Sequence, residues 1–225
     1  MNPTPIESTL RERAGRLRDP KSIADILGQP FVLAGGAMRP AEPRDYDIFG
    51  YDRPICLSEV EGRCRERIDI VVLTTTDNAV TVDCRGQTIQ FCRHFKPTAL
   101  GLVGSFDFSH VQAGVVFDGE GRIADVAYTN AFEDVELHHE IPRYTGSEYP
   151  LSSLARLVKF KSRGDFLPSG DDYFVAQIMA VFRDIVKRGF TDEEDFSAQC
   201  AAISASFEYV DPEELYGLLR KGGAR

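Results

Sequence analysis

The sequence predicts an α+β fold, with a mixed sheet in the N-terminal part and helices in the C-terminal part. Up to about residue 129, short apolar runs alternate with turns that contain glycine or proline, which is typical of strands. After that point apolar residues recur every three or four positions, which is typical of helices. We therefore expect two domains, at residues 1–140 and 141–225.

Composition narrows the class of protein. The 225 residues are 43% hydrophobic and include 15 Phe, enough for a packed core. The net charge of −9 repels nucleic acid in general, so contact with RNA would require a local basic patch.

The expected cellular compartment is inferred from three features that the sequence lacks: a membrane span, a signal peptide and a disulfide pattern. No apolar run approaches the ~20 residues that span a membrane, and residues 1–13 hold no signal-peptide core. Five cysteines, without a C-x-x-C pair, fit neither a disulfide framework nor a zinc knuckle. We expect a cytoplasmic protein with reduced cysteines and no membrane partner.

Capping residues and turn sequences predict where the helices and strands of the N-terminal part begin and end. Ser8 can cap the first helix, and Asp19 caps the second, which has Pro20 in its first turn. Arg85-Gly86 and residues 118–121 are turn sequences between strands. Helices are expected at 8–17, 21–27, 57–67 and 97–103. Strands are expected at 31–34, 45–49, 68–73, 79–84, 88–91, 105–117 and 123–127, those at 31–34 and 68–73 being buried.

Four helices are expected in the C-terminal part. Residues 151–163 and 172–187 each carry an apolar stripe. Thr191 opens a third helix with Glu194 three residues on, as in a capping box. Residues 211–212, Asp-Pro, open the fourth.

The clearest chemical signal lies within residues 31–51. Gly35 and Gly36 follow an apolar run, and bare backbone N–H groups at a glycine turn can bind phosphate oxygens. Arg39 follows and can neutralise a triphosphate. Asp45 and Asp47 share one side of a strand, roughly 7 Å apart, and such carboxylates hold Mg²⁺ together with substrate phosphates.

A third carboxylate would complete this site, and Asp107 is the leading candidate. On a strand, the flanking Phe106 and Phe108 would point into the core and Asp107 would point away from it. Asp69 is the runner-up, for which a structural role is favoured. His138-His139 lacks the spacing of a metal site and is read as a polar helix face.

These residues resemble a known superfamily. G-G-A-M-R at 35–39, followed by D-Y-D at 45–47, is similar to the glycine turn and D-x-D of the DNA polymerase beta-like nucleotidyltransferases. The G-G-x-x-R form is closest to the poly(A) polymerase and CCA-adding branch, and it also resembles small phage-type nucleotidyltransferase-like proteins. Asp107 in SFDFSHVQAGV is similar to the later carboxylate strand, and PLSSLARLVKFKSRGDF at 150–166 to the arginine-containing helix after the catalytic domain.

The chain also departs from that branch. Gly-Ser-Phe-Asp-Phe at 104–108 stands where CCA-adding enzymes have R-R-D-F-T. The E-D-x-x-R base-reading signature is missing, although Arg156 lies on the matching helix. These differences leave the preferred base and the acceptor open.

The resemblance implies a nucleotidyltransferase-like N-terminal domain that moves a nucleoside monophosphate from an NTP, such as ATP, to an acceptor hydroxyl and releases pyrophosphate. The acceptor would be an RNA end, a small molecule or a protein, and the cofactor Mg²⁺ or Mn²⁺. The expected catalytic and metal-binding residues are Asp45, Asp47 and Asp107. The expected nucleotide-binding residues are Gly35, Gly36, Arg39, Arg156 and Lys159.

Three alternatives stay open on the residues alone. The basic helix that holds Arg156 and Lys159 can be a solvated charged face. The fold can serve as a non-catalytic module that binds nucleotide or protein. The same carboxylates can also support a metal-dependent phosphohydrolase.

Overall fold

The protein is described by a computed structural model that covers residues 3–162 and 171–189. The fold is α+β, as predicted, and its strands form a seven-stranded mixed sheet. The chain divides into two compact units, residues 1–106 with 110–139, and residues 107–109 with 140–225. The helices expected from Thr191 and from residue 211 lie outside the described residues, as does Cys200.

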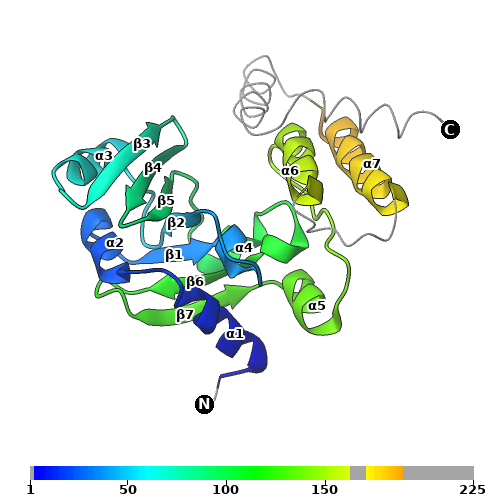
Figure 1. Cartoon of the computed structure of the whole chain (residues 1–225). Coiled ribbons are helices and arrows are strands. Elements are labelled where there is room, and N and C mark those ends of the chain that lie inside the picture. Colours follow the sequence, from blue (N-terminus) through cyan, green and yellow to red (C-terminus); the bar gives the residue numbers. More distant parts are fainter. Residues whose placement is uncertain (1–2, 163–170, 190–225) are drawn as a thin grey trace. The chain divides into compact units, whose positions relative to one another are not determined.

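The sheet belongs wholly to the first unit and has the strand order β3-β4-β5-β2-β1-β6-β7 (Figure 1). β2 and β5 run parallel, and every other neighbouring pair is antiparallel. The strands are β1 Phe31–Ala34, β2 Tyr46–Gly50, β3 Ile70–Thr75, β4 Ala79–Cys84, β5 Gln87–Cys92, β6 Ala113–Phe117 and β7 Ile123–Tyr128. The inner strand β1 is buried along its whole length, because both of its edges are paired and both of its faces are covered.

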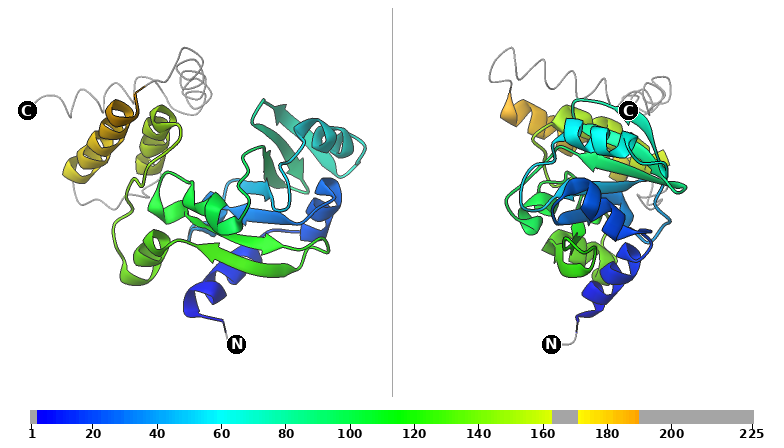
Figure 2. Two further views of the ribbon diagram at one scale, coloured as in Figure 1. Left: turned by 180° about the vertical axis from the view of Figure 1, so that it is seen from behind. Right: turned by 90° about the vertical axis from the view of Figure 1, so that its left-hand side faces the viewer.

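The helices of the first unit cover the two faces of the sheet unequally. They are α1 Pro5–Ala14, α2 Pro20–Leu27, α3 Leu57–Arg65, α4 Ala99–Gly104 and α5 Asn130–His138. Apolar side chains of α1, α2, α3 and α5 pack with alternate strand residues in the larger core. α4 packs on the opposite face, against Val32, Ala34 and Phe49. Figure 2 shows α2 and α3 side by side from two further directions.

The first helix begins one turn earlier than expected. Thr4, not Ser8, is its N-cap, and Thr4 and Glu7 form a reciprocal capping box with Pro5 directly after the cap. Proline fits the first helical turn because its missing N–H would have no helical partner there. By contrast, α2 has the expected cap at Asp19.

The prediction of a buried strand at 68–73 is wrong in both limits and burial. β3 starts at Ile70, and the side chain of Ile68 is fully exposed. β3 is an edge strand that pairs only with β4, and Val71 and Leu73 are 60% and 54% exposed. A run of apolar residues does not reveal whether its strand lies at the edge or the centre of a sheet.

The long strand expected at 105–117 is also wrong, because only Ala113–Phe117 is a strand. Residues 105–112 form turns, and residues 109–111 make a short 3₁₀ helix. The side chain of Gln112 stabilises this irregular backbone, since its Nε2 donates to Phe106 O at 2.7 Å. Side-chain bonds of this kind compete with a regular strand ladder.

The described part of the second unit contains α6, Pro150–Ser162, and α7, Asp171–Arg188. Phe108 packs edge to face with Tyr144 and with Phe160 of α6. The backbone of residues 107–109 is bonded to residues 143–145, so these three residues join the second unit. Within residues 3–162 and 171–189, no helix has both the length and the apolar content of a membrane span.

Candidate functional site

The candidate site begins at the turn that follows β1. Residues Gly35–Met38 form a 3₁₀ helix directly after Ala34. Gly35 has φ +71°, and a Cβ at this position would lie 3.3 Å from Asp47 Oδ2. A residue with a side chain would therefore be both strained and crowded here. At Gly36 a Cβ would meet no atom within 4 Å, so the backbone of this turn is open to an approaching ligand.

The two aspartates flank a residue that faces the opposite way. Tyr46 is buried in the larger core, and its hydroxyl donates to Arg16 O at 3.2 Å. Because side chains alternate along a strand, Asp47 points to the other face of the sheet. Asp45 lies one residue before the strand. Asp47 is also the register partner of Ala34, the last residue before the glycine turn.

Cys92 lies on β5, the parallel neighbour of β2, and its thiol feels the charge of both carboxylates. Burial first, and then the negative charges of Asp47 and Asp45, raise its thiol pKa well above the usual value. Both aspartates therefore lie near enough to this thiol to act on it electrostatically. Gln90, the register partner of Asp47, lies on the same face of the sheet as Asp47 and donates from Nε2 to Thr81 Oγ1 at 3.3 Å. Sequence analysis missed Gln90 and Cys92, since a parallel pairing leaves no local signal.

Arg39 follows the turn and places positive charge near a buried histidine. Burial, together with the charge of Arg39, lowers the pKa of His110 to about 3. His110 is 6% exposed and is therefore neutral at physiological pH. A guanidinium such as that of Arg39 is the kind of charge that favours a phosphate group.

His110 makes stability depend on pH. Its folded pKa of about 3 lies below its ordinary value of 6.5, so the unfolded chain binds more protons between these two pH values. Stability is therefore fully present above pH 6.5 and falls as the pH is lowered toward 3. Between pH 6.5 and pH 5 we expect this group alone to lower the free energy of unfolding by about 2 kcal/mol. Urea unfolding at several pH values measures this slope.

His110→Gln removes the titrating ring while retaining a polar side chain. We expect the free energy of unfolding of the variant to depend less on pH in this range, because the contribution of His110 is removed. His138→Gln, at an exposed position on α5, serves as the matched control. The account of His110 is wrong if His110→Gln and the native protein show the same slope.

Arg13 of α1, and Arg16 just after the end of that helix, hold the backbone that follows the glycine turn. Arg13 is 6% exposed, and its Nη1 donates to Met38 O at 2.6 Å. The same guanidinium forms an ion pair with Glu136 of α5. Arg16 Nη1 reaches the carbonyls that come next, the nearest being Ala41 O at 3.2 Å. The shape of the loop thus depends on a helix that precedes it by more than twenty residues.

The structure brings Asp107 and Arg156 together within the second unit. Asp107 is 3% exposed, and its Oδ2 accepts from Arg156 Nη1 at 2.6 Å and from Ser153 Oγ at 2.7 Å. Asp107 is not on a strand, so the expected reason for its orientation was wrong. Lys159, on the same helix as Arg156, is half-buried.

The runner-up carboxylate has a structural environment. Asp69 accepts hydrogen bonds from Arg67 and from Arg85, and the guanidinium of Arg67 contributes most to lowering its pKa to about 2. His139 ends α5 in a left-handed conformation and continues no helix face. Within the described ranges no cluster of three or more His, Cys, Asp or Glu side chains is arranged to hold a metal ion.

Asp45 and Asp47 nevertheless fit a magnesium ion that arrives with its substrate. Mg²⁺ is commonly held by one or two carboxylates, and substrate phosphates and water complete its shell. Asp47 Oδ2 lies next to the glycine turn, and the space above Gly36 is open. The first unit therefore has two carboxylates of the kind that hold Mg²⁺, and open space beside the backbone of Gly36.

Comparison with known proteins gives a likeness at the level of structure. No family model matches the chain, and no curated protein matches it. A CCA-adding enzyme in complex with CTP matches with a TM-score of 0.53 and 15% identity, over 96% of this chain and 54% of the other. A CCA-adding enzyme in its apo form II matches with a TM-score of 0.52 and 14% identity, over 96% of this chain and 55% of the other.

These matches show the fold, which the chain shares with the two CCA-adding enzymes. This likeness confirms for the fold the resemblance given by residues 35–47. The chain spans about half the length of these solved structures.

Proposed function

We propose that the protein is a metal-dependent nucleotidyltransferase, which moves a nucleoside monophosphate from an NTP to an acceptor hydroxyl and releases pyrophosphate. The observation that carries the proposal is the position of Asp47 Oδ2, against Gly35 and beside the open backbone of Gly36. A carboxylate and an open glycine turn next to each other suit a metal–triphosphate complex. The nucleotidyltransferase fold supports the same reaction class.

In the first unit, some residues would bind the metal ion and others would bind the phosphates. Asp45 and Asp47 would hold Mg²⁺ or Mn²⁺, and the bound ion would neutralise charge on the phosphate oxygens. The backbone at Gly36 and the guanidinium of Arg39 would hold the triphosphate. Catalysis of this kind consists mainly of positioning and charge neutralisation, because phosphoryl-type transfer requires little covalent chemistry from the protein.

The second unit supplies the other proposed residues. We assign Asp107 as a third metal ligand that helps to activate the acceptor hydroxyl, and Arg156 and Lys159 as contacts to the nucleotide. Arg156 now pairs with Asp107, and this pair would have to open or share its charge with a metal. On this assignment residues 1–140 form the catalytic domain and residues 141–225 the helical domain, in a cytoplasmic enzyme.

The acceptor with most support is an RNA 3′ end, because the matching structures are CCA-adding enzymes. A small molecule or a protein hydroxyl remains an alternative acceptor, since the base-reading signature is absent from the sequence.

Two labels on the NTP separate the possible activities. The protein is incubated with Mg²⁺, a pool of short RNAs, and NTP labelled at either the α- or the γ-phosphate. Transfer of α-label to an acceptor, with γ-label released as pyrophosphate, is the expected result. Release of γ-label as inorganic phosphate without transfer identifies a phosphohydrolase. If none of the four NTPs gives release or transfer of label, with small-molecule and protein acceptors also tested, the protein is a non-catalytic binding module.

Gly36→Ala tests the phosphate turn without disturbing the fold. Gly36 lies in the 3₁₀ helix with open space around it, so alanine fits and the melting temperature should stay within a few degrees. The added methyl group stands where a phosphate would approach. We expect the KM for NTP to rise about tenfold, the equivalent of one lost hydrogen bond to a charged group.

Gly86→Ala is the comparison variant, because Gly86 is also open but lies at the turn between β4 and β5. Its positive φ makes alanine cost some stability, but its KM should stay unchanged. An unchanged KM for Gly36→Ala would show that phosphates bind elsewhere.

A further inference from the structure

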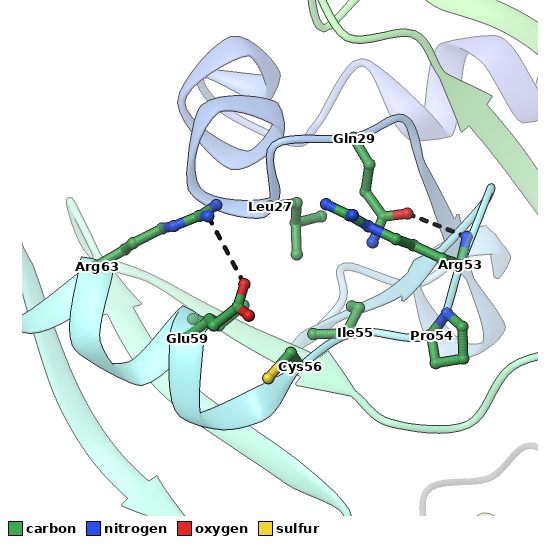
Figure 3. Close-up of a pocket in the computed structure, with 9 residues that line it drawn as sticks. Leu27, Gln29, Arg53, Pro54, Ile55, Cys56, Glu59 and Arg63 are labelled. Atoms are coloured by element: carbon green, nitrogen blue, oxygen red, sulfur yellow. Dashed lines mark hydrogen bonds and ion pairs between the residues drawn. The ribbon is translucent and has the colours of Figure 1, made fainter.

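A cavity lies on the side of the sheet away from Asp47. It measures about 130 Å³ and lies between α2, α3 and the segment that joins β2 to α3 (Figure 3). Its apolar wall is formed by Leu27, Ile55 and Val60, all members of the larger core. The volume is several times the roughly 10–15 Å³ that a single water requires, so a small ligand fits.

Two guanidinium groups converge on this cavity. Figure 3 shows Arg53 and Arg63 pointing toward each other from opposite sides of Leu27. Arg63 is held in place, since its Nη1 donates to Ile26 O at 2.7 Å and its Nη2 lies 3.7 Å from Glu59 Oε2. The guanidinium of Arg53 makes no hydrogen bond or ion pair with the residues that the structure describes. Two like charges that face each other favour an anion between them.

Gln29 adds an amide donor to the same wall. Its residue is 8% exposed, and its Oε1 accepts from the backbone N of Arg53 at 3.2 Å. That bond orients the amide, so that Nε2 lies on the cavity side in Figure 3. Among the described residues, Nε2 donates to no acceptor. Nε2 is not one of the fully buried atoms, so this donor is accessible to a ligand with acceptor oxygens.

We propose that this cavity binds a small phosphate-class oxyanion, either free phosphate or the phosphate end of a small molecule. The guanidinium of Arg53 would donate hydrogen bonds to two oxygens of the anion, and Gln29 Nε2 would donate to a third oxygen. The positive charge of Arg63 would attract the anion. The apolar wall would contact any carbon atoms attached to the phosphate. The carboxylates that bind metal in the proposed function take no part.

The test measures binding of inorganic phosphate to the full chain by calorimetry at constant ionic strength. EDTA is present throughout, so that no metal–phosphate complex can form at Asp45 and Asp47. Adenosine monophosphate is titrated in parallel. Equal affinity for the two identifies a free oxyanion as the ligand, and tighter binding of the nucleotide identifies the phosphate end of a larger molecule.

Arg53→Gln is expected to weaken phosphate binding about tenfold, since it removes the forked charged contact from an exposed side chain. Arg122→Gln makes the same charge change at another exposed arginine, outside the cavity, and should leave binding unaltered. The double variant Asp45→Asn/Asp47→Asn should bind as the native protein does, even if it has lost transfer activity.

Three results would overturn the proposal. They are absence of saturable binding to the native protein, equal weakening by Arg53→Gln and Arg122→Gln, and loss of binding in the double aspartate variant. The last would show that phosphate binding depends on the region of Asp45 and Asp47 and not on the cavity. The proposed nucleotidyl transfer is unaffected by any outcome that concerns Arg53 alone, so the two proposals fail separately.

Discussion

Asp47→Asn is expected to lower nucleotidyl transfer by at least about 1,000-fold while the protein remains folded. Asparagine has nearly the same shape, so the contact with Gly35 is retained. It lacks the negative charge that holds a divalent cation, and a factor of 1,000 corresponds to about 4 kcal/mol of transition-state stabilisation. The rate is measured with α-labelled NTP and the acceptor found in the labelling assay, and the fold is checked by circular dichroism.

Asp45→Asn should have a comparable effect, because Asp45 is two residues from Asp47 and both carboxylates raise the pKa of Cys92. Residues that act as a unit are not additive, so the double variant should be little slower than either single one. Asp77→Asn makes the same change at an exposed aspartate and should retain native activity. Native rates in Asp47→Asn, or equal losses in Asp77→Asn, would remove Asp47 from the site.

Arg13→Met is expected to have the largest effect on stability, a loss of about 3 kcal/mol in the free energy of unfolding. Methionine can fill the space of the side chain, but Met38 O loses its donor and Glu136 keeps an unpaired charge. For a chain of this size the loss corresponds to a fall of roughly 6–12 °C in melting temperature. Thermal unfolding followed by circular dichroism measures it.

Arg11→Met is the matched control on the same helix, and we expect it to change stability by less than about 0.5 kcal/mol. Arg13→Lys retains the positive charge but not the forked guanidinium, so its loss of stability should lie between those of Arg11→Met and Arg13→Met. Because Arg13 holds the residue before Arg39, the variant Arg13→Met should also raise the KM for NTP. Equal melting temperatures for Arg11→Met and Arg13→Met would show that the buried pair contributes nothing.

Local pattern predicted most elements of the first unit, because caps, glycine turns and alternation act over a few residues. It succeeded at the buried strand Phe31–Ala34 and at the Asp19 cap of α2. It failed at β3, where sheet order and not sequence decides exposure. It failed again at residues 105–112, where Gln112 bonds a backbone carbonyl six residues away.

The candidate site shows the same limit. The glycine turn and the two aspartates were predictable, since they lie within thirteen residues of one another. Arg13 was not, because its partners are 25 and 123 residues away in sequence. Gln90 is paired with Asp47, and Cys92 with Phe49, in the parallel pair of β2 and β5, and no local turn in the sequence predicts this pairing. The bond between Asp107 and Arg156 likewise joins residues 49 positions apart.

The most direct test of the central claim is metal binding that depends on Asp45, Asp47 and nucleotide. Mn²⁺ bound to the protein is counted by electron paramagnetic resonance, with and without a non-hydrolysable NTP. We expect the nucleotide to increase Mn²⁺ binding to the native protein, and the variant Asp45→Asn/Asp47→Asn to abolish that increase. Equal Mn²⁺ binding by the variant and the native protein, with nucleotide present, would contradict the account.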